Sequence, residues 1–222
     1  MRVNAGVVPG GHRQVIEQAS RMSVDVHRHY IFPVERLRDA FEAAAEVHAR
    51  SRNPLQTPLL LPDGSLIHVP FAYDDAVDAN KPQPRRTLEP GDALSFGYLL
   101  RVFVDESLEE YLDPEDESYR VRHLKGGGRR AIFPLFLDVR VEPPYAEFVF
   151  SNPTTRLAFV LFAPSSVAVL DYIGRQAGAL VTYENNPDGC FIESPLKTQF
   201  TRPDDDGRGL EAIVRFVEQQ SR

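Results

Sequence analysis

The sequence predicts an α+β fold with a mostly antiparallel sheet, two βαββ-like units and a C-terminal helix. Three observations lead to this prediction. Short runs of alternating apolar and polar residues are typical of half-buried strands. Two stretches with helical spacing each follow a proline, Pro33 or Pro164, which suits the start of a helix. Pro-Asp-Gly turns at 62–64 and 187–189 each separate two short strand-like runs. We expect the 222 residues to form a single globular domain over 1–222.

The first unit spans 23–104. Its alternating first run ends at Pro33, and the residues from Val34 to His48 then place apolar side chains at helical spacing. A hairpin is expected around the turn at 62–64, followed by a polar loop. The expected elements are a strand, a helix, two hairpin strands, the loop and a buried strand, over 24–32, 34–50, 57–61, 65–71, 72–93 and 94–104.

The second unit spans 131–194, and a helix over 207–220 closes the chain. We expect a hydroxyl of Pro164-Ser165-Ser166 to cap the helix of this unit and Gly178 to end it. The expected strands are 131–142, 145–150, 156–162, 179–184 and 190–194. The shared element order indicates a duplication; the alternative is that βαββ units and such turns recur independently.

The doubled strand–helix–strand–strand order resembles the drug-binding regulatory domains of the gyrase-inhibitor-like class. The resemblance implies a small amphipathic molecule held in a cleft between the two halves. Strand aromatics are the candidates to line that cleft: Phe96, Tyr98, Phe148, Phe150 and Tyr183. The charged segment between the units departs from the pattern of that class.

Residues 105–130 form this charged insert. Its first half carries eight carboxylates, which are the candidate partner-binding residues: Asp105, Glu106, Glu109, Glu110, Asp113, Glu115, Asp116 and Glu117. The second half is basic, so the two halves could pair with each other across neighbouring strands. The alternative is an acidic surface that docks onto a cationic protein. A formal net charge of -7 argues against nucleic acid as the partner.

His27-Arg28-His29 is the local pattern closest to a reactive site. Two histidines two apart on a strand share a face, so both imidazoles could reach one metal ion. The stretch SVDVHRHYIFP also resembles the first strand of metal-dependent amidohydrolases, which implies a hydrolase that uses His27 and His29. That family needs further histidines and a late aspartate on successive barrel strands, whereas only His48, His68 and His123 follow here. We therefore expect no metal and no other cofactor, with the histidine pair as the weaker alternative.

The remaining reactive side chains are scattered. Glu147, Glu184 and Glu193 lie on expected strands, where burial would raise the pKa of a carboxyl, but no pattern brings two of them together. Cys190 has no histidine after it and is expected to be a small buried side chain. The sequence thus assigns no catalytic residue.

Composition indicates the class of protein. The single cysteine excludes a disulfide within the chain, and neither a signal peptide nor a membrane-spanning apolar run is evident, so we expect a cytoplasmic protein. Only three of the 25 basic residues are lysine, a bias typical of GC-rich bacterial genomes. The leading hypothesis is a non-enzymatic bacterial binding protein that neutralises a basic protein, as an immunity protein neutralises its toxin. The alternatives are a small-molecule sensor or carrier and a metal-dependent hydrolase.

Overall fold

The computed structural model describes residues 26–49, 55–75, 81–186, 189–194, 198–200 and 209–220. Residues 23–25 of the first expected unit lie outside these ranges, as do Pro187 and Asp188 of the second turn. Of Cys190 and Glu193 the structure gives only the backbone. The predicted places of these side chains therefore stay predictions.

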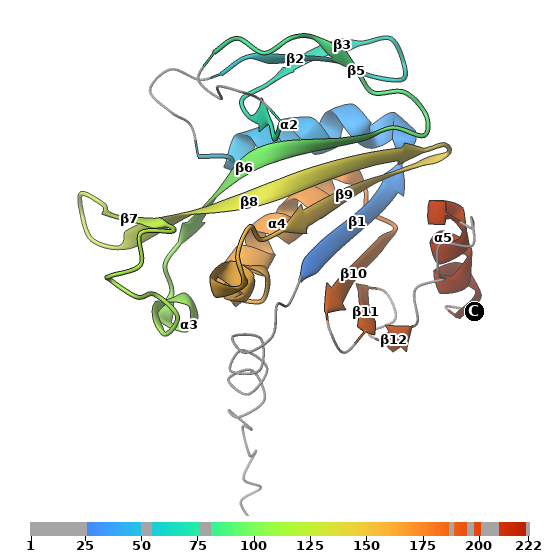
Figure 1. The fold of residues 1–222 in the computed structure, drawn as a ribbon. Helices are drawn as coiled ribbons and strands as arrows, with labels where there is room; N and C mark the ends of the chain where they lie inside the picture. The colour runs from blue at the N-terminus through green and yellow to red at the C-terminus, as the bar shows by residue number, and fades with distance from the viewer. Residues whose placement is uncertain are drawn as a thin grey trace, which may run out of the picture.

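A large sheet forms the centre of the described residues (Figure 1). Its strands follow the order β12-β11-β10-β1-β9-β8-β6-β4, with β7 also paired to β8, and every pairing is antiparallel. The strands are β1 (His27–Pro33), β4 (Ala72–Tyr73), β6 (Ala93–Phe103), β7 (Arg120–His123), β8 (Arg129–Glu142), β9 (Tyr145–Ser151), β10 (Val181–Asn186), β11 (Gly189–Ser194) and β12 (Thr198–Phe200). The predicted α+β class with a mostly antiparallel sheet is confirmed.

A second, three-stranded sheet lies beyond helix α2 (Figure 1). It joins β3 (Leu66–Val69), β2 (Thr57–Leu60) and β5 (Arg86–Thr87) in that order. The predicted hairpin is its β2–β3 pair, with a turn at Gly64, whose φ of 80° favours glycine. The expected loop over 72–93 contains β4 and β5, so it is only partly a loop.

The helices lie on both faces of the large sheet. They are η1 (Val34–Arg36), α2 (Leu37–Val47), α3 (Glu106–Glu109), η2 (Thr155–Leu161), α4 (Pro164–Ala177) and α5 (Gly209–Gln220). Helices α2 and α4 pack side by side, and α4 lies against β1 and β6 (Figure 1). Helix α5 is the predicted C-terminal helix, and it packs against β8, β9 and β10. No helix among the described residues combines the length and apolar character needed to span a membrane.

Alternation along β1 decides which side chains face which helices. Tyr30 and Phe32 join the main core beneath α2 and α4, whereas Ile31 joins a separate apolar cluster under α5. Leu210 of α5 belongs to that cluster, and its backbone N–H donates to the Glu142 carboxylate, 2.8 Å away. A carboxylate from β8 thus satisfies the helix N-terminus.

Helix α4 approaches β1 closely at Gly174. A Cβ at this position would lie 2.4 Å from Cδ1 of the Tyr30 ring, which is far inside van der Waals contact. Glycine is therefore required for this helix–strand packing. The helix ends as predicted at Gly178, whose φ of 66° is the left-handed conformation of a C-terminal cap.

Two predictions in the second unit are wrong. Residues 156–162 do not form a strand, because η2 covers most of them. All of 157–161 are buried, and such a continuous apolar run has no period that distinguishes strand from helix. Helix α4 begins at Pro164 with Ala163 as N-cap, and neither serine hydroxyl finds a hydrogen-bond partner among the described residues. The proline itself fixes the first turn.

The strand–helix–strand–strand order still occurs twice. It runs β1–α2–β2–β3 and then β9–α4–β10–β11. The first hairpin belongs to the small sheet and the second to the large sheet, so the two units differ in where their last strands pair. The duplication stays a prediction.

Candidate functional site

The acidic half of the insert is an ordered projection at one end of the large sheet. We call residues 105–117 the acidic arm. It begins with α3, where the Asp105 carboxylate accepts a hydrogen bond from the backbone N–H of Leu108 at 2.8 Å. Leu108 is fully buried, and α3 packs against α4. The four-residue helix is therefore fixed to the core by its cap and by one apolar anchor.

Local hydrogen bonds order the rest of the arm. The Asp113 carboxylate accepts from the backbone N–H of Glu115 at 2.9 Å, in the pattern of an Asx turn. The Tyr119 hydroxyl donates to the carbonyl of Asp113 at 2.7 Å. Tyr111 stacks on Phe159 of η2 with ring centroids 5.5 Å apart. These contacts hold the backbone of the arm while seven of its eight carboxylates stay exposed and Asp116 is half-buried.

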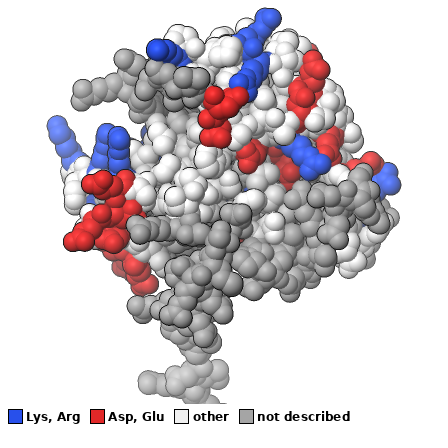
Figure 2. Space-filling view, in the orientation of Figure 1, with Lys and Arg blue, Asp and Glu red and all other residues white. Residues whose placement is uncertain are grey.

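Only part of the arm's charge is neutralised within the molecule. Glu109 forms an ion pair with Arg129 of β8, so one carboxylate of the acidic half pairs with the basic half, although from helix α3 and not from a neighbouring strand. Within the described ranges, four exposed carboxylates of the arm form neither an ion pair nor a hydrogen bond through their side chains: Glu106, Glu110, Glu115 and Glu117. Figure 2 shows the red side chains gathered at the left of the molecule, with blue side chains of the basic half beside them. The two signs of charge therefore form adjacent patches and are not mixed.

An apolar strip lies on the sheet next to the arm. We give this name to Leu99, Phe103, Ile132, Pro134 and Phe136 of β6 and β8. Leu99 is 39% exposed and Phe103 60% exposed. Leu99 pairs with Pro134 across the two strands, and their neighbours Tyr98 and Leu100 point into the main core instead. The strip thus occupies the face of the sheet opposite α2 and α4, and α5 contacts β8 at the other end of that strand, at Glu142.

The strip ends at the charged insert. The guanidinium carbon of Arg130 lies 4.5 Å from the centroid of the Phe103 ring. Phe103 is followed by Val104 and then by Asp105, the first residue of the arm. An exposed aromatic ring, a cation and the unpaired carboxylates therefore meet at one end of the molecule.

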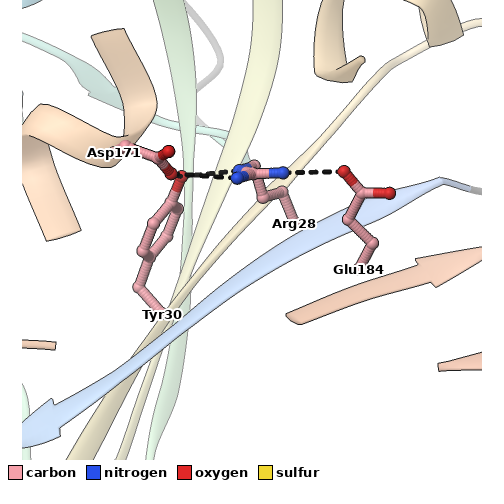
Figure 3. A network of polar contacts seen from close by, with 4 residues as sticks. All are labelled: Arg28, Tyr30, Asp171 and Glu184. Atoms are coloured by element: carbon pink, nitrogen blue, oxygen red, sulfur yellow. Dashed lines mark hydrogen bonds and ion pairs between the residues drawn. The ribbon is translucent and has the colours of Figure 1, made fainter. Parts of the chain in front are cut away.

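Arg28 anchors a buried polar network on the helix-covered face (Figure 3). Its side chain is fully buried, and it donates to Glu184 of β10 at 2.7 Å and to Asp171 of α4 at 2.9 Å. Its Nε donates to the Tyr30 hydroxyl at 2.7 Å, and that hydroxyl donates to Asp171 at 2.9 Å. Burial raises the pKa of Tyr30 well above its usual range, so the phenol stays protonated.

This network ties α4, β1 and β10 together and fills the hydrogen-bonding capacity of the Tyr30 hydroxyl. Sequence reasoning named Arg28 only as the residue between the two histidines, and it did not single out Asp171. The sequence did contain a signal for Arg28. It is two residues from Tyr30 and four from Phe32, so alternation along β1 places its cation on the face that points into the core.

His29 belongs to a second buried network on the opposite face of β1. Its Nδ1 lies 2.9 Å from Oε1 of Glu147, and the Tyr183 hydroxyl donates to the same oxygen at 2.9 Å. The imidazole and the Tyr183 ring are stacked, with centroids 4.1 Å apart and planes 9° apart. The ring centroid of His27 lies 6.0 Å from that of His29. The strand histidines are therefore neighbours, as predicted.

The strand carboxylates engage different partners. Glu147 faces His29, whereas Glu184 faces Arg28 on the other side of the sheet. They form no catalytic pair with each other. Among the described residues, no three His, Cys, Asp or Glu side chains converge in a way that could hold a metal ion.

The aromatics predicted to line a ligand cleft fill the interior. Phe148 and Phe96 pack edge-on against Phe41 of α2, with centroids 5.1 and 6.0 Å away. The Tyr98 hydroxyl donates to the Ala44 carbonyl at 2.7 Å, and its ring contacts Phe150. Tyr183 lies on the other face with His29. Four of these five side chains thus share one core beneath α2, and the fifth is buried apart from them.

Comparisons with known proteins found no match for this chain. No protein family matches it, and neither a curated protein nor a solved structure does. Among the described residues, the architecture is a large antiparallel sheet with α2 and α4 on one face and α5 on the other.

Proposed function

We propose that this chain is a non-enzymatic binding protein of the bacterial cytosol that neutralises a basic protein partner, as an immunity protein neutralises its toxin. The observation that carries the proposal is the acidic arm, whose four unpaired carboxylates are held on an ordered backbone. A surface whose backbone is already ordered loses little conformational entropy on binding. Its negative potential would also steer a cationic partner toward it.

The apolar strip supports a protein over a free cation as the partner. Phe103 exposes apolar surface directly beside the arm, and Leu99 extends that surface along β6. Protein interfaces combine such an apolar centre with a charged rim. The occupant we propose is a basic segment with apolar residues between its cations. Its lysines or arginines would pair with the carboxylates while its apolar residues cover the strip.

The test uses a synthetic peptide of alternating lysine and leucine as the probe. The arm variant carries Glu106→Gln, Glu110→Gln, Glu115→Gln and Glu117→Gln. Each exposed ion pair contributes about 0.2–1 kcal/mol, so the loss of four pairs weakens binding between about four-fold and about nine-hundred-fold at low salt. The salt dependence of affinity should flatten in parallel.

A matched control removes four exposed carboxylates elsewhere through Glu35→Gln, Asp74→Asn, Glu89→Gln and Glu218→Gln. It has the same net charge as the arm variant and should bind the probe nearly as well as the native chain. Equal affinities of the two variants would contradict the role of the arm. Tight binding of a lysine–serine peptide of equal charge, or no effect of Phe103→Ser, would contradict the role of the strip. A dimer in sedimentation that Phe103→Ser breaks would assign the strip to a second copy of the chain and overturn the proposal.

A further inference from the structure

The buried environment of His29 leaves one of its two ring nitrogens without a function in the fold. Nε2 is buried and has no hydrogen-bond partner within the described ranges. A buried polar atom left in this way costs about 1–3 kcal/mol. The other interactions of the ring account for its position but not for this atom.

The contact with Glu147 determines the chemistry of Nε2. A carboxylate only accepts hydrogen bonds, so Nδ1 carries the proton that bridges the 2.9 Å to Oε1. In the neutral ring Nε2 then bears a lone pair. A carboxylate behind the distal nitrogen also raises the basicity of a histidine ligand and fixes its tautomer. The arrangement is that of a metal ligand with its supporting carboxylate.

The ring is also held rigidly. Tyr183 stacks on one face of the imidazole, and its hydroxyl binds the same carboxylate oxygen as Nδ1. Glu147 and Tyr183 come from β9 and β10, the two strands that flank β1, so both sides of His29 are fixed by the sheet. The lone pair of Nε2 therefore has one preferred direction.

His27 supplies a second nitrogen ligand on the same face. A metal ion lies about 2.0–2.1 Å from a coordinating ring nitrogen, and thus roughly 3.2 Å from the ring centroid. Two imidazoles on one tetrahedral ion then have centroids about 5.2 Å apart. Those of His27 and His29 are 6.0 Å apart, so a shift of less than about 1 Å by the half-buried His27 ring would bring both to one ion. Ser151 and Asn185 lie directly opposite His27 on the flanking strands, so polar groups surround the same spot.

We propose that His29 and His27 bind one divalent transition-metal ion, with Glu147 as the carboxylate that supports His29. Imidazole nitrogen favours Zn²⁺, Ni²⁺ and Cu²⁺ over Mg²⁺ and Ca²⁺. Two protein nitrogens leave open coordination positions, which water or a small ligand fills. This site lies at a different place from the acidic arm, so its existence does not depend on the partner proposed above.

The experiment titrates untagged, chelator-treated protein with Zn²⁺ or Ni²⁺ alone by calorimetry, with Mg²⁺ as the comparison ion. The expected result is one ion bound per chain and no binding of Mg²⁺. Glu147→Gln should weaken binding about ten- to hundred-fold, because it removes the supporting charge. His27→Ala, at a half-buried position, and His29→Gln should each abolish the saturable binding. His68→Ala is the matched control, because His68 is exposed on the small sheet.

Spectra of the Cu²⁺ form provide a second measurement that a purely structural role would not change. Nitrogen hyperfine splitting from two imidazoles should be visible in the native chain and should be lost in the His27→Ala variant. Absence of saturable binding would overturn the proposal and leave Nε2 bound to water only. Binding that survives both histidine substitutions, or that His68→Ala lowers equally, would also overturn it.

Discussion

The close approach of α4 to β1 gives the sharpest stability prediction. Gly174 is buried inside α4, although glycine costs about 1 kcal/mol relative to alanine in a helix interior. The ring of Tyr30 explains the choice, because Gly174→Ala would place a methyl carbon 2.4 Å from Cδ1 and 2.7 Å from Cε1. The ring cannot simply rotate away, since the hydroxyl is bound to both Arg28 and Asp171.

The net effect follows from two opposing contributions. Forcing a methyl into a packed core costs typically 1–3 kcal/mol, and moving Tyr30 also weakens hydrogen bonds to charged groups that contribute about 1.5–3 kcal/mol each. The gain in helix propensity offsets about 1 kcal/mol. We expect Gly174→Ala to lower the free energy of unfolding by about 2 kcal/mol, measured by urea denaturation at neutral pH.

A double-mutant cycle isolates the cause. Tyr30→Ala alone should cost about 3–5 kcal/mol, as the loss of a large buried aromatic does. In that background the methyl at position 174 meets no ring, so Gly174→Ala should become neutral or stabilising by up to about 1 kcal/mol. An equal cost of Gly174→Ala in both backgrounds, or stabilisation of the native chain, would refute the packing argument.

Two further predictions concern the buried polar groups. Arg28→Met leaves the carboxylates of Asp171 and Glu184 without their cation. Breaking a buried ion pair costs about 3–5 kcal/mol of unfolding free energy. We expect a loss of about 3 kcal/mol, because these two side chains are 33% and 13% exposed. Arg36→Met removes the exposed pair with Asp39 and an exposed hydrogen bond to the Gln176 carbonyl, and it serves as control. Its loss should be no more than about 1 kcal/mol in the same urea assay; equal losses would contradict the buried network. Burial raises the pKa of Tyr98 far above its usual range. Above about pH 10 the unfolded chain therefore loses this proton while the folded chain keeps it. The free energy of unfolding then falls by up to about 1.4 kcal/mol per pH unit. Tyr98→Phe should flatten that slope, and an unchanged slope between pH 10 and 11.5 would show that the tyrosine does not cause it.

Local patterns predicted most elements of this fold but not how they pair. Alternation and apolar runs placed β6, β8 and β9 to within about two residues and β1 to within about three. The order of the sheet depends on long-range contacts. Strand β1 lies between β9 and β10, more than 100 residues later in the chain, and no short-range feature of the sequence specifies those partners.

Side-chain roles were predictable where local chemistry determines them. Asp105 and Asp113 accept backbone hydrogen bonds within three residues, which is the usual behaviour of aspartate at helix starts and turns. The aromatics of β6 and β9 show the opposite case. Phe96 and Phe148 face inward toward Phe41, and only the packing of α2 decides whether an inward face is a core or a cleft. A strand pattern alone contains no information on what covers it.

The networks of Arg28 and His29 start from adjacent residues of β1, and together they fix the register of this strand. Arg28 lies directly opposite Glu184 on β10, and His29 lies directly opposite Tyr183, so successive residues bind successive partners on opposite faces. A slip of one residue would move Arg28 to the α5 side and His29 into the main core, and both networks would break. Register therefore explains the guanidinium of Arg28 and Nδ1 of His29. It gives no reason for a histidine over other hydrogen-bond donors at position 29, and Nε2 remains the atom whose chemistry the fold itself does not require.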